Sequence, residues 1–86
     1  MRYDCGIQYD RIATWLNDEL RLPREGVDWI FSTDGASCRV SALPLESRSL
    51  GGGIQIERTL LSAQGDQSAL DVFERLFTLR FVSAGG

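Results

Sequence analysis

An Asp-Gly pair lies between two segments of alternating apolar and polar residues, and it constrains the fold more than any other feature of the sequence. Asp34 and Gly35 suit a two-residue hairpin turn of type I′, in which both central residues have positive φ. The register set by this turn separates an apolar face from a polar face, whereas a slip of one residue would mix them. The predicted cross-strand pairs are Thr33 with Ala36, Phe31 with Cys38, Trp29 with Val40 and Val27 with Ala42.

The run from Ile54 to Val82 predicts a strand, a polar turn, an amphipathic helix and a second strand. The first strand ends at the polar cluster of residues 64–67. Ser68 then suits a helix N-cap, with Asp71 three residues later. Alternation returns over residues 78–82, which favours a β-α-β unit, and a single helix through Val82 is the alternative. The apolar side of the predicted helix consists of Leu70, Phe73, Leu76 and Phe77.

A second amphipathic helix is predicted before the hairpin. Asp10 suits its N-cap, and Pro23 should end it because the residue before a proline is disfavoured in the helical region. Residues 2–9 alternate in polarity but are few, so a leading strand there stays open. The apolar side of this helix consists of Ile12, Ala13, Trp15, Leu16 and Leu20.

Residues 43–53 interrupt the alternation with a proline and three consecutive glycines. Such a stretch fixes its backbone dihedrals only at a large cost in entropy, so we expect a mobile loop. In the strand that follows, Ile56 and Leu61 have opposite parity. A β-bulge near residues 57–59 would bring both onto one face. Residues 84–86 are expected to form a flexible tail.

These elements predict one α+β domain over residues 1–86, folded as a two-layer sandwich with about four mainly antiparallel strands and two helices on one face. The predicted order is α-β-β-β-α-β, and a ferredoxin-like arrangement is one fold compatible with it. No apolar run approaches the roughly 18 residues of a membrane span, so no membrane contact is expected. The start of the chain lacks a signal-peptide pattern, and Cys5 and Cys38 lie far apart, which together indicate a cytoplasmic protein.

The residue types needed for common catalytic and metal sites are scarce. The chain has no histidine, which removes histidine-based triads and the commonest general base. Two isolated cysteines do not supply a zinc site. The glycines of residues 51–53 precede a strand, whereas a phosphate-binding loop follows a strand and opens onto a helix. We therefore expect no catalytic residue, no cofactor-binding residue and no metal ligand, and we predict that the protein is not an enzyme.

The charge balance disfavours nucleic acid as a partner. The net charge is −3 and the sequence pI is about 4.7, so the chain offers little to neutralise phosphates. The order helix-strand-strand-strand-helix resembles that of double-stranded-RNA-binding domains in topology alone, because the basic cluster at their second helix is missing here. All nine basic residues are arginine, which is typical of a GC-rich, bacterial source.

Protein–protein contact is the function class that remains. A final strand over residues 78–82 at a sheet edge would carry one charge to protect it, so it would be free to pair with another chain. We predict a homodimer or a complex with a protein partner. The alternative is a small-ligand or anion-binding module that uses the outer sheet face and the glycine loop. A third hypothesis is an enzyme that uses Cys5 together with carboxylates. The predicted interaction face consists of Ile30, Arg39, Arg80 and Val82.

Overall fold

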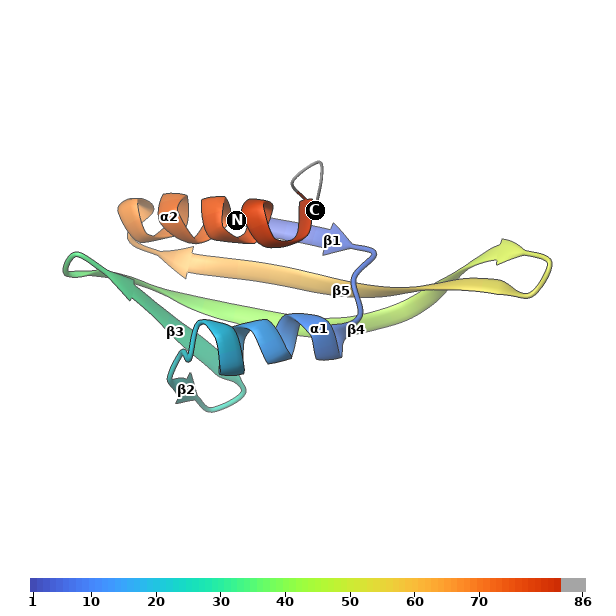
Figure 1. Cartoon of the computed structure of the whole chain (residues 1–86), viewed down its shortest axis with the longest axis horizontal. Helices are drawn as coiled ribbons and strands as arrows, with labels where there is room; N and C mark the ends of the chain where they lie inside the picture. The colour runs from blue at the N-terminus through green and yellow to red at the C-terminus, as the bar shows by residue number, and fades with distance from the viewer. Residues whose placement is uncertain (83–86) are drawn as a thin grey trace.

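The structure is a computed structural model that describes residues 1–82, and it contains a five-stranded antiparallel sheet in the order β1-β5-β4-β3-β2 (Figure 1). Helical segments cover one face of this sheet, and we call the opposite face the outer face. No helix among these residues is long and apolar enough to cross a membrane. The elements are β1 (Arg2–Cys5), α1 (Tyr9–Thr14) with the π-helical turn η1 (Trp15–Glu19), β2 (Arg24–Glu25), β3 (Asp28–Thr33), β4 (Ala36–Gly51), β5 (Ile54–Gly65), and α2 (Gln67–Phe77) with the π-helical turn η2 (Thr78–Val82).

The β3–β4 hairpin has the predicted register. Trp29 lies opposite Val40, both are fully buried, and the turn residues Asp34 and Gly35 have φ values of 48° and 80°. The outermost predicted pair is wrong, because Val27 is 80% exposed. The chain reverses at Val27 and the preceding glycine, so that β2 can pair with the start of β3.

The sheet has five strands rather than four, because part of residues 2–9 forms a leading strand. Strand β1 pairs antiparallel with β5. The backbone nitrogen of Met1 donates to the Ala63 carbonyl at 3.2 Å, and the Ala63 N–H donates back to the Met1 carbonyl at 3.0 Å. The observed order is therefore β-α-β-β-β-β-α. Neither the predicted order nor the ferredoxin-like arrangement is confirmed.

The C-terminal segment is helical, so the prediction of a strand over residues 78–82 is wrong and the single-helix alternative is right. Phe77 and Phe81 lie one helical turn apart, with ring centroids separated by 5.5 Å, and Phe81 also contacts Trp15. A strand would have buried Leu79 beside Phe81, but Leu79 is 62% exposed. The flexible tail predicted at residues 84–86 lies outside the residues that the structure describes.

Both helices begin slightly earlier than predicted. The N-cap of α2 is Asp66 rather than Ser68, and that of α1 is Gln8 rather than Asp10. Neither cap makes a side-chain hydrogen bond to its own helix. The Asp66 carboxylate instead accepts a hydrogen bond of 2.9 Å from the Ser37 N–H, so this residue joins the start of α2 to the β3–β4 hairpin.

Residues 43–53 are not a loop. Strand β4 continues to Gly51, a two-residue glycine turn follows, and β5 begins at Ile54. We call residues 43–58 the arm, and Figure 1 shows it extending beyond both helices. The predicted bulge at residues 57–59 is wrong, since the register shifts occur in β4 between Leu45 and Arg48 and again between Ser49 and Gly51. Strand β5 continues regularly there, so Ile54 and Ile56 lie on the outer face, opposite to buried Leu61.

The core lies between the sheet and the helices. Trp15 packs against Phe73 with ring centroids 5.5 Å apart, which shows that both helical segments cover the same face, as predicted. Thr59 is the one fully buried polar residue among those described, and its hydroxyl donates to the Ile7 carbonyl at 2.6 Å. The buried apolar side chains are Ile12, Trp15, Leu16, Trp29, Phe31, Cys38, Val40, Leu61, Ala63, Ala69, Phe73 and Phe77.

Candidate interaction surface

The predicted interaction residues fall into two separate places. Ile30 and Arg39 are cross-strand neighbours on β3 and β4. They belong to the outer face, because the residues beside them in each strand are buried against the helices. Arg80 and Val82 lie on η2, in the helical layer on the other side of the sheet. The four residues therefore do not form one face, because the strand that would have joined them is a helix.

Arg39 is held by its neighbours on the outer face. Its guanidinium forms ion pairs with Glu25 and, at 3.1 Å, with Asp28. Asp28 also accepts a hydrogen bond of 2.8 Å from the Ser41 hydroxyl. The Ser41 hydrogen bond, followed by the Arg39 contact, lowers the pKa of Asp28 below its usual value. This cluster satisfies its own charges, which leaves Arg39 poorly suited to bind a separate anion.

Arg80 links the two helical segments instead of protecting a strand edge. Its Nε and a terminal nitrogen donate to the two carboxylate oxygens of Glu19 at 3.1 and 3.2 Å. The guanidinium carbon also lies 4.9 Å from the centre of the Phe81 ring. Hydrogen bonding to Arg80 lowers the pKa of Glu19. Arg80 therefore has a structural role at the contact between η1 and η2.

A second ion pair and an apolar strip complete the outer face. Arg58 donates from Nε to Asp4 at 3.1 Å and forms a further bond to the same carboxylate. Between this pair and the Arg39 cluster, Leu43 and Leu60 are cross-strand neighbours, and Leu43 is 56% exposed. The outer face is thus a narrow apolar strip between two groups of internally paired charges.

The arm carries the exposed apolar residues that sequence analysis did not recognise as a surface. Leu50, Ile54 and Ile56 are 57%, 60% and 39% exposed. Ile54 and Ile56 alternate along β5, so they share a face of the arm. A Gly-Gly pair between two extended segments favours a hairpin turn in the same way as Asp-Gly does. That pair at residues 52–53 was the signal that could have revealed the arm.

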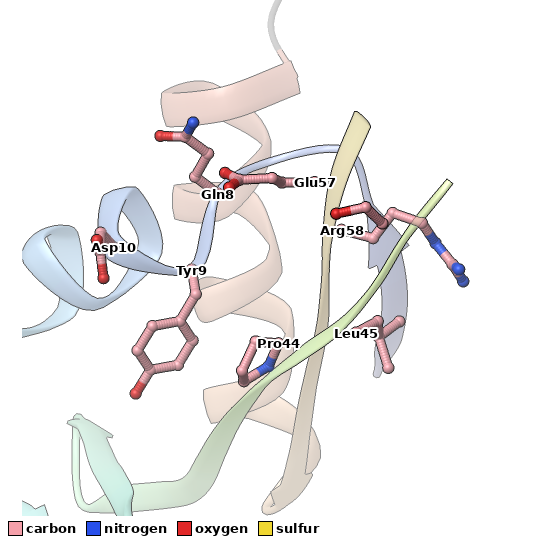
Figure 2. A pocket seen from close by; sticks show the side chains of 8 residues that line it. Gln8, Tyr9, Asp10, Pro44, Leu45, Glu57 and Arg58 are labelled. Atoms are coloured by element: carbon pink, nitrogen blue, oxygen red, sulfur yellow. The ribbon is translucent and has the colours of Figure 1, made fainter. Parts of the chain in front are cut away.

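A shallow hollow of about 300 Å³ lies where the start of α1 faces the base of the arm (Figure 2). Tyr9 and Pro44 face each other across one part of it, and Gln8 and Glu57 lie close together in another part. Arg58 also lines the hollow, but its guanidinium points away, toward its partner Asp4. The charges left at the hollow are carboxylates, an arrangement unfavourable for an anion. The full lining is Gln8, Tyr9, Asp10, Pro44, Leu45, Ser47, Glu57 and Arg58.

The remaining reactive side chains are protonated thiols. Cys5 donates from Sγ to the Thr59 carbonyl at 3.3 Å, and Cys38 is buried in the core. Burial raises the pKa of both thiols, which lowers their reactivity as nucleophiles. Across residues 1–82 no three histidine, cysteine, aspartate or glutamate side chains converge in a way that could hold a metal ion.

Comparisons of this chain with protein-family models, with curated proteins and with solved structures find no match.

Proposed function

We propose that this protein is not an enzyme and that it works through protein–protein contact, as a homodimer joined by the arm. The observation that carries this proposal is the exposure of Ile54 and Ile56 on a two-stranded hairpin that projects beyond the helical layer. An isolated two-stranded hairpin is marginally stable in water. A second chain that covers these isoleucines would stabilise both the hairpin and the complex.

The exposed area predicts a weak dimer. Ile54 and Ile56 are 60% and 39% exposed, so together they correspond to about one fully exposed isoleucine. Burial of one such side chain contributes about 1.5–3 kcal/mol, or about 3–6 kcal/mol for two copies. Association costs at least about 4 kcal/mol in lost translational and rotational freedom. Backbone hydrogen bonds between the copies must supply the difference, and we expect dissociation constants of micromolar or weaker.

The alternative of an anion-binding module has less support. It needs a free cation near the outer face or the glycine turn. Arg39, Arg58 and Arg80 each have a carboxylate partner within this chain. Arg48, opposite Ile56 in the arm, makes no ion pair among residues 1–82, so it is the cation near the glycine turn that this alternative would use. The turn glycines lie at the tip of the arm with open space around them, away from the Arg39 cluster on β3 and β4.

The test compares two pairs of exposed apolar residues, of which the control pair is the more exposed. Ile54→Ser with Ile56→Ser removes the apolar surface of the arm. Leu79→Ser with Val82→Ser is the matched control, since those residues are 62% and 60% exposed on η2. Sedimentation velocity from about 5 to 500 µM should give a mass that rises with concentration for the wild type and the control, and a constant monomer mass for the arm variant.

Two results would contradict the proposal. One is a wild-type protein that stays monomeric at about 500 µM, because weaker contacts rarely represent specific interfaces. The other is a dimer that persists in the Ile54→Ser, Ile56→Ser variant and dissociates in the control. That second outcome would return the interface to residues 78–82, one of the two places that the sequence pattern predicted beside the outer sheet face.

A further inference from the structure

We propose that the homodimer, if the proposed function holds, forms by antiparallel pairing of β5 with β5 of a second copy, with the two-fold axis at Gln55. The arm has two free strand edges. One edge belongs to β4 and the other to β5, and they differ in their ability to form backbone hydrogen bonds with another strand. This difference favours β5 as the pairing strand, and the side chains along it favour one register.

The free edge of β5 begins where β1 ends. Met1 and Ala63 exchange backbone hydrogen bonds, so the N–H and C=O groups of Ala63 face β1. Backbone groups alternate in direction along a strand. Every second residue back from Ala63 therefore faces the same side, which includes Gln55 and Glu57. Strand β1 ends at Cys5, opposite Thr59, so the backbone groups of Gln55 and Glu57 have no strand beside them.

The other edge of the arm, on β4, is protected. The Ile30 N–H donates to the Pro23 carbonyl on the β2 side at 2.9 Å. Its neighbour Trp29 therefore faces β4 and its cross-strand partner Val40 faces β3. Every second residue after Val40 faces the same side of β4, which includes Pro44. Pro44 lies beyond the start of β3, so it is on the free edge, and it has no N–H to donate. The register shifts near Glu46 and Leu50 further interrupt this edge, and proline and bulges both prevent strand pairing.

A two-fold axis at Gln55 gives the most favourable set of pairs. The two Gln55 residues would exchange both backbone hydrogen bonds. Ile54 of each copy would then lie opposite Ile56 of the other, in the close, non-hydrogen-bonded positions where side chains contact most strongly. All four isoleucines would share one face, since Ile54 and Ile56 are two residues apart. The exposed isoleucines of the two arms would thereby cover each other.

The neighbouring register, with the axis at Ile56, is less favourable. It would place Arg58 opposite Ile54 and bring the second copy closer to Gly6. Gly6 lies beside the Ile56 side chain, since a β-carbon added to it would be in ordinary van der Waals contact with the Ile56 methyl group at 3.5 Å. With the axis at Gln55, the residue opposite Glu57 is Gly53 of the second copy, which has no side chain. An open hollow of about 610 Å³ beside this edge, lined in part by Gly6, Gln55 and Glu57, leaves room for that approach.

The first experiment is a proline substitution on each edge of the arm. Gln55→Pro removes an N–H that faces away from β4, so the hairpin keeps its own ladder. Ser49→Pro is the control on the other edge, because Ser49 lies directly opposite Gln55 in the same hairpin, with its N–H toward the free edge of β4. It also removes the hydroxyl that accepts a 3.4 Å hydrogen bond from the Gly51 N–H, so it perturbs the hairpin at least as much as Gln55→Pro. Sedimentation should show dimer affinity reduced at least about tenfold by Gln55→Pro and unchanged by Ser49→Pro. Circular dichroism of both variants should match that of the wild type.

A cysteine cross-link tests the register without weakening the edge. Opposed residues in hydrogen-bonded antiparallel pairs have Cα atoms about 5.5 Å apart, within the range of a disulfide. In a Cys5→Ser background, Gln55→Cys should form disulfide-linked dimers on mild oxidation. Val27→Cys should not, although Val27 is 80% exposed.

The outcomes separate this inference from the proposed function. A monomeric wild type overturns both. A wild-type dimer that depends on Ile54 and Ile56 but survives Gln55→Pro, and that does not cross-link through Gln55→Cys, leaves the homodimer in place and overturns the β5 pairing. Loss of the dimer in Gln55→Pro together with efficient Gln55→Cys cross-linking supports the pairing and its register.

Discussion

Replacing Gly65 by alanine should destabilise the protein by at least about 3 kcal/mol. Gly65 is the last residue of β5 and has φ of 147°, in the region that disfavours side chains. A β-carbon there would lie 2.6 Å from both the Cys38 Cα and the Ser37 carbonyl oxygen. These contacts involve backbone atoms, which cannot rotate away. The clash can be relieved only if β5 separates from β4 at the point where the chain enters α2.

The magnitude follows from what this separation would disrupt. The Asp66 N–H donates to the Ser37 carbonyl at 3.0 Å and the Ser37 N–H donates to the Asp66 carboxylate at 2.9 Å. Each hydrogen bond contributes about 0.5–1.5 kcal/mol. The unfavourable φ adds about 1–2 kcal/mol for a residue with a side chain. The overpacking itself costs about 1–3 kcal/mol, so even the lower ends of these ranges sum to about 3 kcal/mol.

Urea denaturation followed by tryptophan fluorescence measures this loss, because both tryptophans are buried. Gly52→Ala is the control, since Gly52 also has a positive φ of 57° but has no atom within 4 Å of an added β-carbon. It should lose only the conformational contribution of about 1–2 kcal/mol. Equal losses for the two variants, or a loss below about 1 kcal/mol for Gly65→Ala, would refute the close approach of β5 to the hairpin.

Two further predictions concern the core and the ion pairs. Trp29→Ala should lower the free energy of unfolding by about 3–5 kcal/mol in urea denaturation, whereas Val27→Ala, on an exposed turn, should change it by less than about 0.5 kcal/mol. The folded-state pKa values of Asp28 and Glu19 are lowered by their hydrogen-bond partners, so their stabilisation is present above the ordinary carboxyl pKa and is lost as pH falls through the lowered values. Asp28→Asn should therefore reduce the acid-induced loss of stability measured by urea denaturation below pH about 4, and an unchanged pH profile would contradict the Asp28 contacts.

The sequence predicts those elements in which local pattern and burial agree. In the β3–β4 hairpin, the Asp34-Gly35 turn and the apolar face indicate the same register, and that register is observed. Beyond its base the arm has no helix over it, so burial imposes no apolar alternation there, and the register shifts in β4 interrupt the alternation that remains. An exposed hairpin of this kind therefore has the same sequence pattern as a loop.

Residues 78–82 illustrate a second limit. Five residues with Leu79 and Phe81 apolar fit a period of two as well as a short helical extension. The choice depends on tertiary contacts: Phe81 packs on Trp15, and Arg80 pairs with Glu19. Neither partner is near in sequence. For the same reason the four predicted interaction residues do not share a face. Arg80 and Val82 were placed beside Ile30 and Arg39 only because residues 78–82 were predicted to be a strand.

The outer face remains a competing dimer interface, and Leu43→Ser tests it. Leu43 is the most exposed residue of the apolar strip there. A two-fold packing of outer faces would bury the Arg39–Asp28 and Arg58–Asp4 pairs against their copies, and removal of charges from water costs several kcal/mol per ion unless new partners are well placed. Pairing through β5 leaves the Arg39–Asp28 pair in solvent and brings only Gly52 of the second copy opposite Arg58. We therefore expect Leu43→Ser to change the dimer dissociation constant by less than about threefold, a difference below 1 kcal/mol, in the sedimentation series. A dimer that dissociates on Leu43→Ser but tolerates Ile54→Ser with Ile56→Ser would place the interface on the strip of Leu43 and Leu60 instead of at Ile54 and Ile56.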